Sequence, residues 1–224
     1  MKAIALPVEI ETALDSGATL AISISGGKDS QAMLNALAAL WETKGWVAPY
    51  AVHADLGRME WKQTKAHCQK ICDAVGIPLV VVNRPQGDLL QEMQERMEKL
   101  RGTDKPPFPS ATQRYCTSDQ KRAQIDKVLR SPFPSSTQRY CTADQKRDQI
   151  LKVHRQHNLV VSAMGFRSAE SPARAKRSVV SVQRRITAKA LCDLTPEAAL
   201  VAKGEGQRLA LDWLPLFDWT EADV

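Results

Sequence analysis

The chain has 224 residues and a mass of 24.8 kDa, enough to bury a full core within one large domain. Hydrophobic residues make up 43% and charged residues 25%, the composition of an ordinary globular protein. No apolar run approaches the length of a membrane span, so we expect no membrane segment and a cytoplasmic location. The net charge of +6 suits an anionic ligand, which could be a nucleotide, a sulfated metabolite or a nucleic acid.

The five cysteines form no CxxC pair, which indicates neither a disulfide framework nor a zinc ribbon. Cys68 and Cys72 lie one helical turn apart. This spacing favours two buried thiols on one helix face over a metal site.

Strand and helix patterns alternate along the chain, and each helix pattern carries apolar residues at helical spacing. Helices are predicted over residues 7–16, 30–43, 60–75 and 87–100, and strands over residues 19–25, 46–54, 77–83 and 158–165. This order implies parallel βαβ units and an α/β fold with a doubly wound, mainly parallel, Rossmann-like sheet and helices on both faces.

A tandem duplication occupies the middle of the chain. The segment 107–128 recurs as 132–153, and the two copies differ at four positions. Two copies do not make a solenoid, so we expect a single domain over 1–224 that contains two loop–helix segments. Leu151 is apolar where Asp126 is charged, and the second copy leads into the late strand. We therefore interpret the second copy as the native element and the first as an insertion.

The last residues have the pattern of a helix start, with Thr220 as the cap and Asp223 three residues later. No helical segment follows in the sequence. We expect the full-length protein to continue beyond Val224.

The segment Ser25-Gly26-Gly27-Lys28-Asp29-Ser30 joins a predicted strand to a predicted helix. Unpaired amides and the helix dipole favour an anion at such a place, and glycines let the backbone approach a phosphate. The serine hydroxyls and the lysine charge add donors, whereas Asp29 would orient the loop or hold a hydrated Mg²⁺. The alternative is a glycine-rich turn without a ligand, since neither the Walker nor the dinucleotide pattern fits.

Five segments in order resemble the PAPS reductase and ATP sulfurylase family of PP-loop enzymes, where PAPS denotes phosphoadenosine phosphosulfate. They are SGGKDS (25–30), VHADLG (52–57), RYCT with a following lysine (139–146, and also 114–121), GFRSAESPARAKR (165–177) and LPLFDWTEADV (214–224). The resemblance implies an adenine nucleotide α-hydrolase type of fold that binds ATP or PAPS.

The resemblance also assigns roles to single residues. It implies that Asp55 and Gly57 contact the adenosine portion, although Asp55 could instead cap the helix expected near residue 60. Arg167 would contact phosphate or sulfate in a bidentate manner, and Arg174 would extend the positive surface. Lys176 is better interpreted as a solvated basic residue.

The duplicated segment offers further candidates. Lys146 would add charge to the nucleotide pocket, with Arg139 a weaker candidate. Cys141 is either a nucleophile favoured by nearby cations or a structural thiol. His53 beside Asp55 is interpreted as structural.

Three functions remain open at this point. The first is an ATP pyrophosphatase that adenylates an acceptor with Lys28, Arg167 and Mg²⁺ stabilising charge. The second is a PAPS reductase, which needs a nucleophilic cysteine and a sulfur-donor or thioredoxin-like protein partner. The third is a nucleotide- or nucleic-acid-binding component of DNA sulfur modification, for which no interleaved aromatic platform is visible. Each is compatible with a homo-oligomer.

Overall fold

The computed structural model describes residues 3–83, 85, 87–102, 146 and 148–224. The chain divides into two compact units. Unit 1 comprises Met1–His53, Gln63–Val82 and Ile150–Val224, and unit 2 comprises Ala54–Lys62 and Asn83–Gln149. We describe each unit by itself.

Unit 1 is built on a six-stranded sheet with the order β3-β2-β1-β4-β6-β5. The strands are β1 (Thr19–Ser23), β2 (Tyr50–Ala54), β3 (Leu79–Val82), β4 (Leu159–Met164), β5 (Val180–Val182) and β6 (Leu209–Trp213). β2, β1, β4 and β6 are parallel neighbours, and β5 runs antiparallel to β6 at the edge. The mainly parallel α/β fold expected from the sequence is confirmed.

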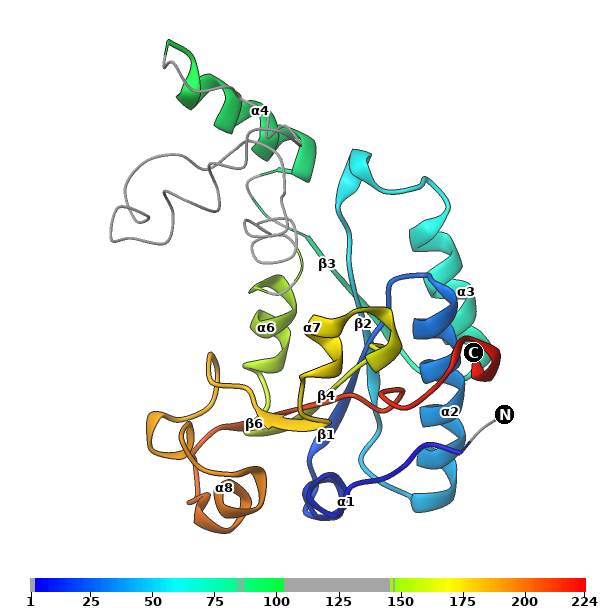
Figure 1. The fold of residues 1–224 in the computed structure, drawn as a ribbon, viewed down its shortest axis with the longest axis vertical. Coiled ribbons are helices and arrows are strands. Elements are labelled where there is room, and N and C mark those ends of the chain that lie inside the picture. The colour runs from blue at the N-terminus through cyan, green and yellow to red at the C-terminus, as the bar shows by residue number, and fades with distance from the viewer. Residues whose placement is uncertain (1–2, 84, 86, 103–145, 147) are drawn as a thin grey trace. The chain divides into compact units, whose positions relative to one another are not determined.

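Helices alternate with the strands, as the pattern predicted (Figure 1). They are α1 (Val8–Asp15), α2 (Lys28–Lys44), α3 (Thr64–Ala74), α4 (Leu89–Leu100), α6 (Asp148–His154), α7 (Pro172–Ala175) and α8 (Pro196–Ala202). Short 3-10 turns complete the described elements: η1 (Gly57–Met59), η3 (Ser168–Glu170), η4 (Lys189–Leu191) and η5 (Glu221–Asp223).

One face of the sheet forms the main core. Its strand side chains include Leu20, Ile22 and Leu211, all essentially inaccessible to solvent. Helices α1, α2, α3 and α8 contribute buried residues to the same cluster. Cys68 and Cys72 of α3 belong to it as free, buried thiols, which confirms the expected pair.

The opposite face of the sheet has a smaller core that includes Tyr50, Val52 and Val160. Leu151 of α6 is 4% exposed and packs into this cluster. The apolar residue that distinguishes the second copy of the duplication is therefore a core residue. The first copy lies outside the described residues.

Unit 2 contains η1 and α4, which contact one another. Asp88 caps α4 by accepting a hydrogen bond from the Gln91 amide at 2.9 Å, while its carboxylate pairs with Arg58 of η1. Arg58 Nε and Nη2 each donate to one oxygen of the Asp88 carboxylate. This bidentate pair connects η1 to the first turn of α4. This pairing holds the pKa of Asp88 well below its usual range.

Several boundaries differ from the sequence expectation. α2 begins at Lys28, two residues early, so Lys28 and Asp29 lie in its first turn. β2 and α3 are shorter than predicted, and β5, β6 and α8 were not predicted at all. Among the described residues, no helix combines the length and apolar character needed to cross a bilayer.

Candidate functional site

The glycine-rich segment forms a loop between β1 and α2 that is held by the Ser30 hydroxyl. This hydroxyl donates to the Gly27 carbonyl at 2.8 Å and accepts from the Ser25 amide at 3.2 Å. Ser30 is 6% exposed, whereas Ser25, Gly27 and Lys28 are exposed. Ser30 therefore shapes the loop from inside, and the exposed residues are accessible from solvent.

Gly26 is required by the geometry of the loop. Its φ of +76° lies in the left-handed region, and an added Cβ would lie 3.1 Å from the Thr64 Cγ2 atom and 3.5 Å from the Cys68 sulfur. The loop thus packs directly on α3. Gly27 is the N-cap of α2 and offers no side-chain acceptor, so no side chain of the described residues caps the first helix amides.

Lys28 forms an ion pair with a residue from the far end of the chain. Its Nζ lies 2.5 Å from Glu221 Oε1, and both side chains are largely exposed. Thr220 and Asp223 form a capping box around the turn that carries Glu221. The Lys28 contact, with a smaller effect of Arg167, lowers the pKa of Glu221.

Arg167 follows β4 and meets Asp29 in the first turn of α2. Its Nη2 donates to Asp29 Oδ2 at 3.3 Å, and its Nε lies 3.3 Å from Oδ1 without the alignment of a hydrogen bond. Arg167 is 8% exposed. Gly165 packs against the backbone of Asp29 and Ser30, so β4 directly supports the loop.

Arg174 is held by two contacts in the segment after β4. It pairs with Glu170 one helical turn earlier, and its guanidinium lies 4.8 Å from the centre of the Phe166 ring. Arg177 lies over the same ring at 5.5 Å, and Lys176 is exposed.

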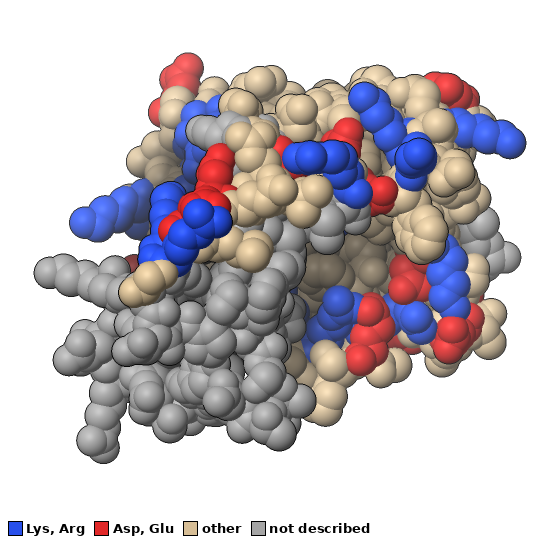
Figure 2. All heavy atoms as spheres, turned by 90° about the horizontal axis from the view of Figure 1, so that it is seen from above, with Lys and Arg blue, Asp and Glu red and all other residues tan. Residues whose placement is uncertain are grey.

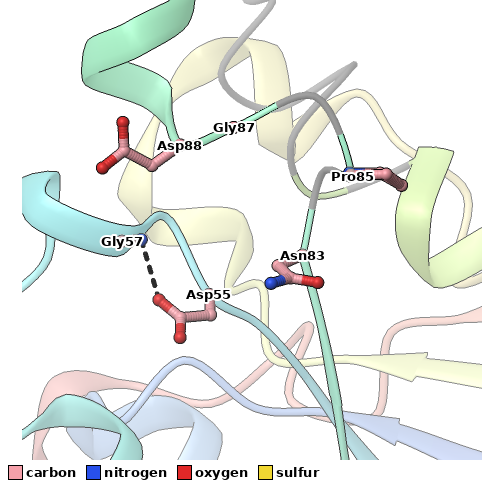
Figure 3. A pocket seen from close by; sticks show the side chains of 6 residues that line it. All are labelled: Asp55, Gly57, Asn83, Pro85, Gly87 and Asp88. Carbon is pink, nitrogen blue, oxygen red and sulfur yellow. Dashed lines mark hydrogen bonds between the residues drawn. The ribbon is translucent and has the colours of Figure 1, made fainter.

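The second group of predicted residues lies in unit 2. Asp55, Gly57, Asn83, Pro85, Gly87 and Asp88 line a pocket of about 260 Å³. Asp55 Oδ1 accepts a hydrogen bond from the Gly57 amide at 2.8 Å, as Figure 3 shows. This bond closes a local turn, and α3 begins only at Thr64, so Asp55 is not the cap of that helix.

Lys146 lies in the same unit and forms an ion pair with Glu60 at 3.6 Å. Glu60 also accepts from the Leu56 amide at 3.4 Å. Cys141 and Arg139, and the corresponding residues of the first copy, lie outside the described residues. Their candidate roles stay predictions.

His53 is buried at the end of β2, with 1% of its surface exposed. Its Nδ1 lies 3.2 Å from the Ile24 carbonyl oxygen and 3.8 Å from the Cys68 sulfur. These contacts fit the structural interpretation of His53.

Two residues of these sites were missed in the sequence. Glu221 lies within a segment that carried the family resemblance, but nothing local indicates its pairing with Lys28 across 193 residues. Asp88 carried a usable signal, since an aspartate directly before an amphipathic helix pattern is a preferred N-cap.

Cations and carboxylates alternate on the face shown in Figure 2, with blue and red side chains intermixed among the described residues. Within the described part of the chain, this face therefore has no continuous basic stripe of the kind that follows a nucleic-acid backbone.

The parallel sheet, with a glycine-rich loop at the carboxyl end of β1, defines an α/β protein of the adenine nucleotide α-hydrolase type. A family model, the phosphoadenosine phosphosulfate reductase domain, matches residues 19–224. The chain belongs to this family. No curated protein matches the chain.

Among solved structures, the chain is similar to FMN adenylyltransferase from Candida glabrata, which was crystallised with FMN and the ATP analogue AMPCPP. The identity is 12% and the TM-score 0.42, with 95% of this chain and 48% of that chain covered. The chain thus spans about half the length of that protein.

Proposed function

We propose that the chain is an enzyme that binds an adenine nucleotide at the Ser25–Ser30 loop and uses ATP to adenylate an acceptor with release of pyrophosphate. The observation that carries this proposal is the loop itself. It is intact, it opens α2 with uncapped amides, and β4 delivers Arg167 to its first helical turn. Family membership supports the nucleotide class.

The residues of the loop would act by positioning and by charge. The amides at the start of α2 and Lys28 would hold the phosphates. Arg167 would stabilise the charge that develops as the bond between the α- and β-phosphates breaks. Asp29 keeps the guanidinium of Arg167 in place through its ion pair.

Mg²⁺ fits this site as a companion of the nucleotide. Mg²⁺ is usually held by one or two carboxylates together with substrate phosphates. Asp29 would serve as the protein ligand; its Oδ1 has no hydrogen-bond partner among the described residues and lies 3.3 Å from Arg167 Nε in the ion pair. The ion would neutralise part of the phosphate charge.

The second candidate, thiol-dependent PAPS reduction, has less support from the described cysteines. Burial raises the pKa of Cys72 to about 11, and Cys68 is inaccessible. The Cys192 sulfur faces three backbone carbonyls at 3.5 Å each. Burial disfavours a reactive thiolate at Cys72. Cys141, the candidate nucleophile, and its counterpart Cys116 in the first copy lie outside the described residues and remain for this candidate, with a thioredoxin-like partner.

A role in DNA sulfur modification is a third candidate, and the adenylation chemistry would suit it as an activation step. A cytoplasmic location and assembly into a homo-oligomer belong to the proposal as well.

The test is calorimetric titration of the chain with ATP–Mg²⁺ and with PAPS, beside a Lys28→Ala variant. Lys44→Ala is the matched control, because Lys44 lies at the other end of α2 and also forms an exposed ion pair, with Glu11 at 2.5 Å. We expect ATP–Mg²⁺ binding that is lost in Lys28→Ala and kept in Lys44→Ala. Tighter PAPS binding would favour the reductase, and binding of neither nucleotide would contradict the proposal.

A further inference from the structure

A second pocket lies in unit 1, apart from the residues assigned to the nucleotide. It has a volume of about 100 Å³ and is lined by Met164, Arg177, Ser178, Ser181, Asp212 and Leu214. Its walls come from the ends of β4 and β6, from β5, and from the segment before β5.

A polar row crosses the sheet at this pocket. Ser162 of β4, Asp212 of β6 and Ser181 of β5 are register partners, so their side chains lie on the same face. The next row on that face toward the amino ends of β4 and β6 consists of Val160 and Ala210. A carboxylate in the middle strand of such a row loses hydration and needs a compensating donor.

Asp212 is only partly compensated by the protein. Its Oδ2 accepts from the Gln183 side-chain amide at 2.7 Å, and within the described part of the chain no other hydrogen bond reaches this carboxylate. Burial raises the pKa of Asp212 to about 6, against the smaller opposing effects of Gln183 and Arg177. The other oxygen makes no hydrogen bond within the described part of the chain and is therefore a strong acceptor, and Asp212 lines the pocket.

Arg177 supplies the opposite charge in the same pocket. Its guanidinium lies 5.5 Å from the centre of the Phe166 ring, and its charge lowers the pKa of Asp212. Arg177 and Asp212 attract one another across the pocket without a direct ion pair, so a ligand that carries both charges can contact each of them.

We propose that this pocket binds the head group of a small α-amino acid, with its ammonium on Asp212 and its carboxylate on Arg177. The Ser181 hydroxyl would complete the polar contacts, together with the Ser178 oxygen as an acceptor, since the Ser178 hydroxyl donates to the Val180 carbonyl at 2.7 Å. Met164 and Leu214 would pack on the α-carbon. The volume equals that of about three water molecules, which is the scale of such a head group. A divalent cation fits poorly, because the described residues bring no three acidic, histidine or cysteine side chains together.

This inference goes beyond the nucleotide proposal and shares no residue with it. The two sites are nevertheless linked through β4. Met164 lines the pocket, and the next residue, Gly165, packs against the phosphate loop.

The test is a titration of the ¹⁵N-labelled chain with glycine, followed by amide NMR shifts. We expect saturable shifts at Ser181 and Asp212, and binding weakened by about tenfold or more in Asp212→Asn and in Arg177→Gln. Methylammonium and acetate, which each carry one of the two charges, should bind more weakly by a similar factor. Asp193→Asn and Arg184→Gln are matched controls, since these residues form an exposed ion pair in the same unit, and they should bind glycine like the wild type.

The proposal is overturned if glycine causes no saturable shift, or if Asp212→Asn binds glycine as tightly as the wild type. ATP–Mg²⁺ calorimetry on the same variants separates the two sites. Lys28→Ala should keep glycine binding, and Asp212→Asn should keep nucleotide binding, so the failure of one proposal leaves the other measurable.

Discussion

The two faces of the unit 1 sheet differ in how many buried polar groups they contain. We call the face with the larger cluster the apolar face and the opposite one the polar face. The face covered by α1, α2, α3 and α8 is a continuous apolar cluster. The other face has a smaller cluster, and it contains buried polar groups without a hydrogen-bond partner among the described residues: the Tyr50 hydroxyl and both His154 ring nitrogens. The first face provides stability and supports the Ser25–Ser30 loop, whereas the buried polar groups of the second face cost stability.

The largest expected effect is on the apolar face. Leu34 of α2 is fully buried there. We expect Leu34→Ala to lower the free energy of unfolding by about 2–5 kcal/mol, through lost transfer energy and a residual cavity. Urea denaturation measures this loss. Val8→Ala is the control, because Val8 is 74% exposed, and it should change stability by less than about 0.5 kcal/mol.

His154 makes the polar face sensitive to acid. Burial, with a smaller effect of His157, lowers its pKa from 6.5 to about 4. Between these two pH values the unfolded chain binds more protons than the folded one, so stability should fall as pH drops from 6.5 toward 4. We expect a loss of about 3 kcal/mol from this group at the low end.

His154→Phe tests this sign. The variant should lose less stability than the wild type between pH 6.5 and 4, whereas His67→Gln, which changes an exposed histidine, should follow the wild-type profile. If the free energy of unfolding fell equally with pH in the wild type and in His154→Phe, the acid sensitivity would not come from His154.

The titration of Asp212 changes the free energy of unfolding in the opposite direction, because it lowers stability as the pH rises. Its pKa is raised from 3.8 to about 6, so the folded chain binds the extra proton and the ionised carboxylate costs stability above pH 6. We expect Asp212→Asn to be about 2–3 kcal/mol more stable than the wild type at pH 7. Thermal unfolding at several pH values should show this gain shrinking through the interval from pH 6 to 4. If the stability gain of Asp212→Asn did not change with pH, it would not come from the ionisation of Asp212.

The close packing of the apolar face extends to the Ser25–Ser30 loop. Gly26→Ala places an L-residue at φ +76° and a Cβ against Thr64, whereas Gly45→Ala places one at φ +65° with no atom within 4 Å. Both should cost about 1–2 kcal/mol from backbone strain. We expect Gly26→Ala to cost more than Gly45→Ala and also to weaken ATP–Mg²⁺ binding, which calorimetry measures. Equal costs with unchanged binding would show that the loop tolerates a side chain.

The sequence was most informative where a pattern is local. β1, α2 and β4 follow from apolar spacing, and the loop follows from its two glycines. β6 was missed because Asp212 interrupts its apolar run, and its strand character comes from pairing with β4 and β5. β5 has only three residues, too few for a pattern. The pairs Lys28–Glu221 and Asp29–Arg167 join residues 193 and 138 positions apart, which no local pattern encodes.

The smallest expected effect concerns Glu221. Its carboxylate contacts the Lys28 ammonium group, where a nucleotide phosphate would bind, so the two anions compete for one cation. The pair is exposed and screened by salt, which limits the effect. We expect Glu221→Gln to tighten ATP–Mg²⁺ binding by about two- to fivefold at low salt, and the gain to shrink as salt rises. Glu11→Gln, which removes the equivalent partner of Lys44, should leave the affinity unchanged. Weaker nucleotide binding in Glu221→Gln would instead identify Glu221 as a residue that positions Lys28 for the phosphate.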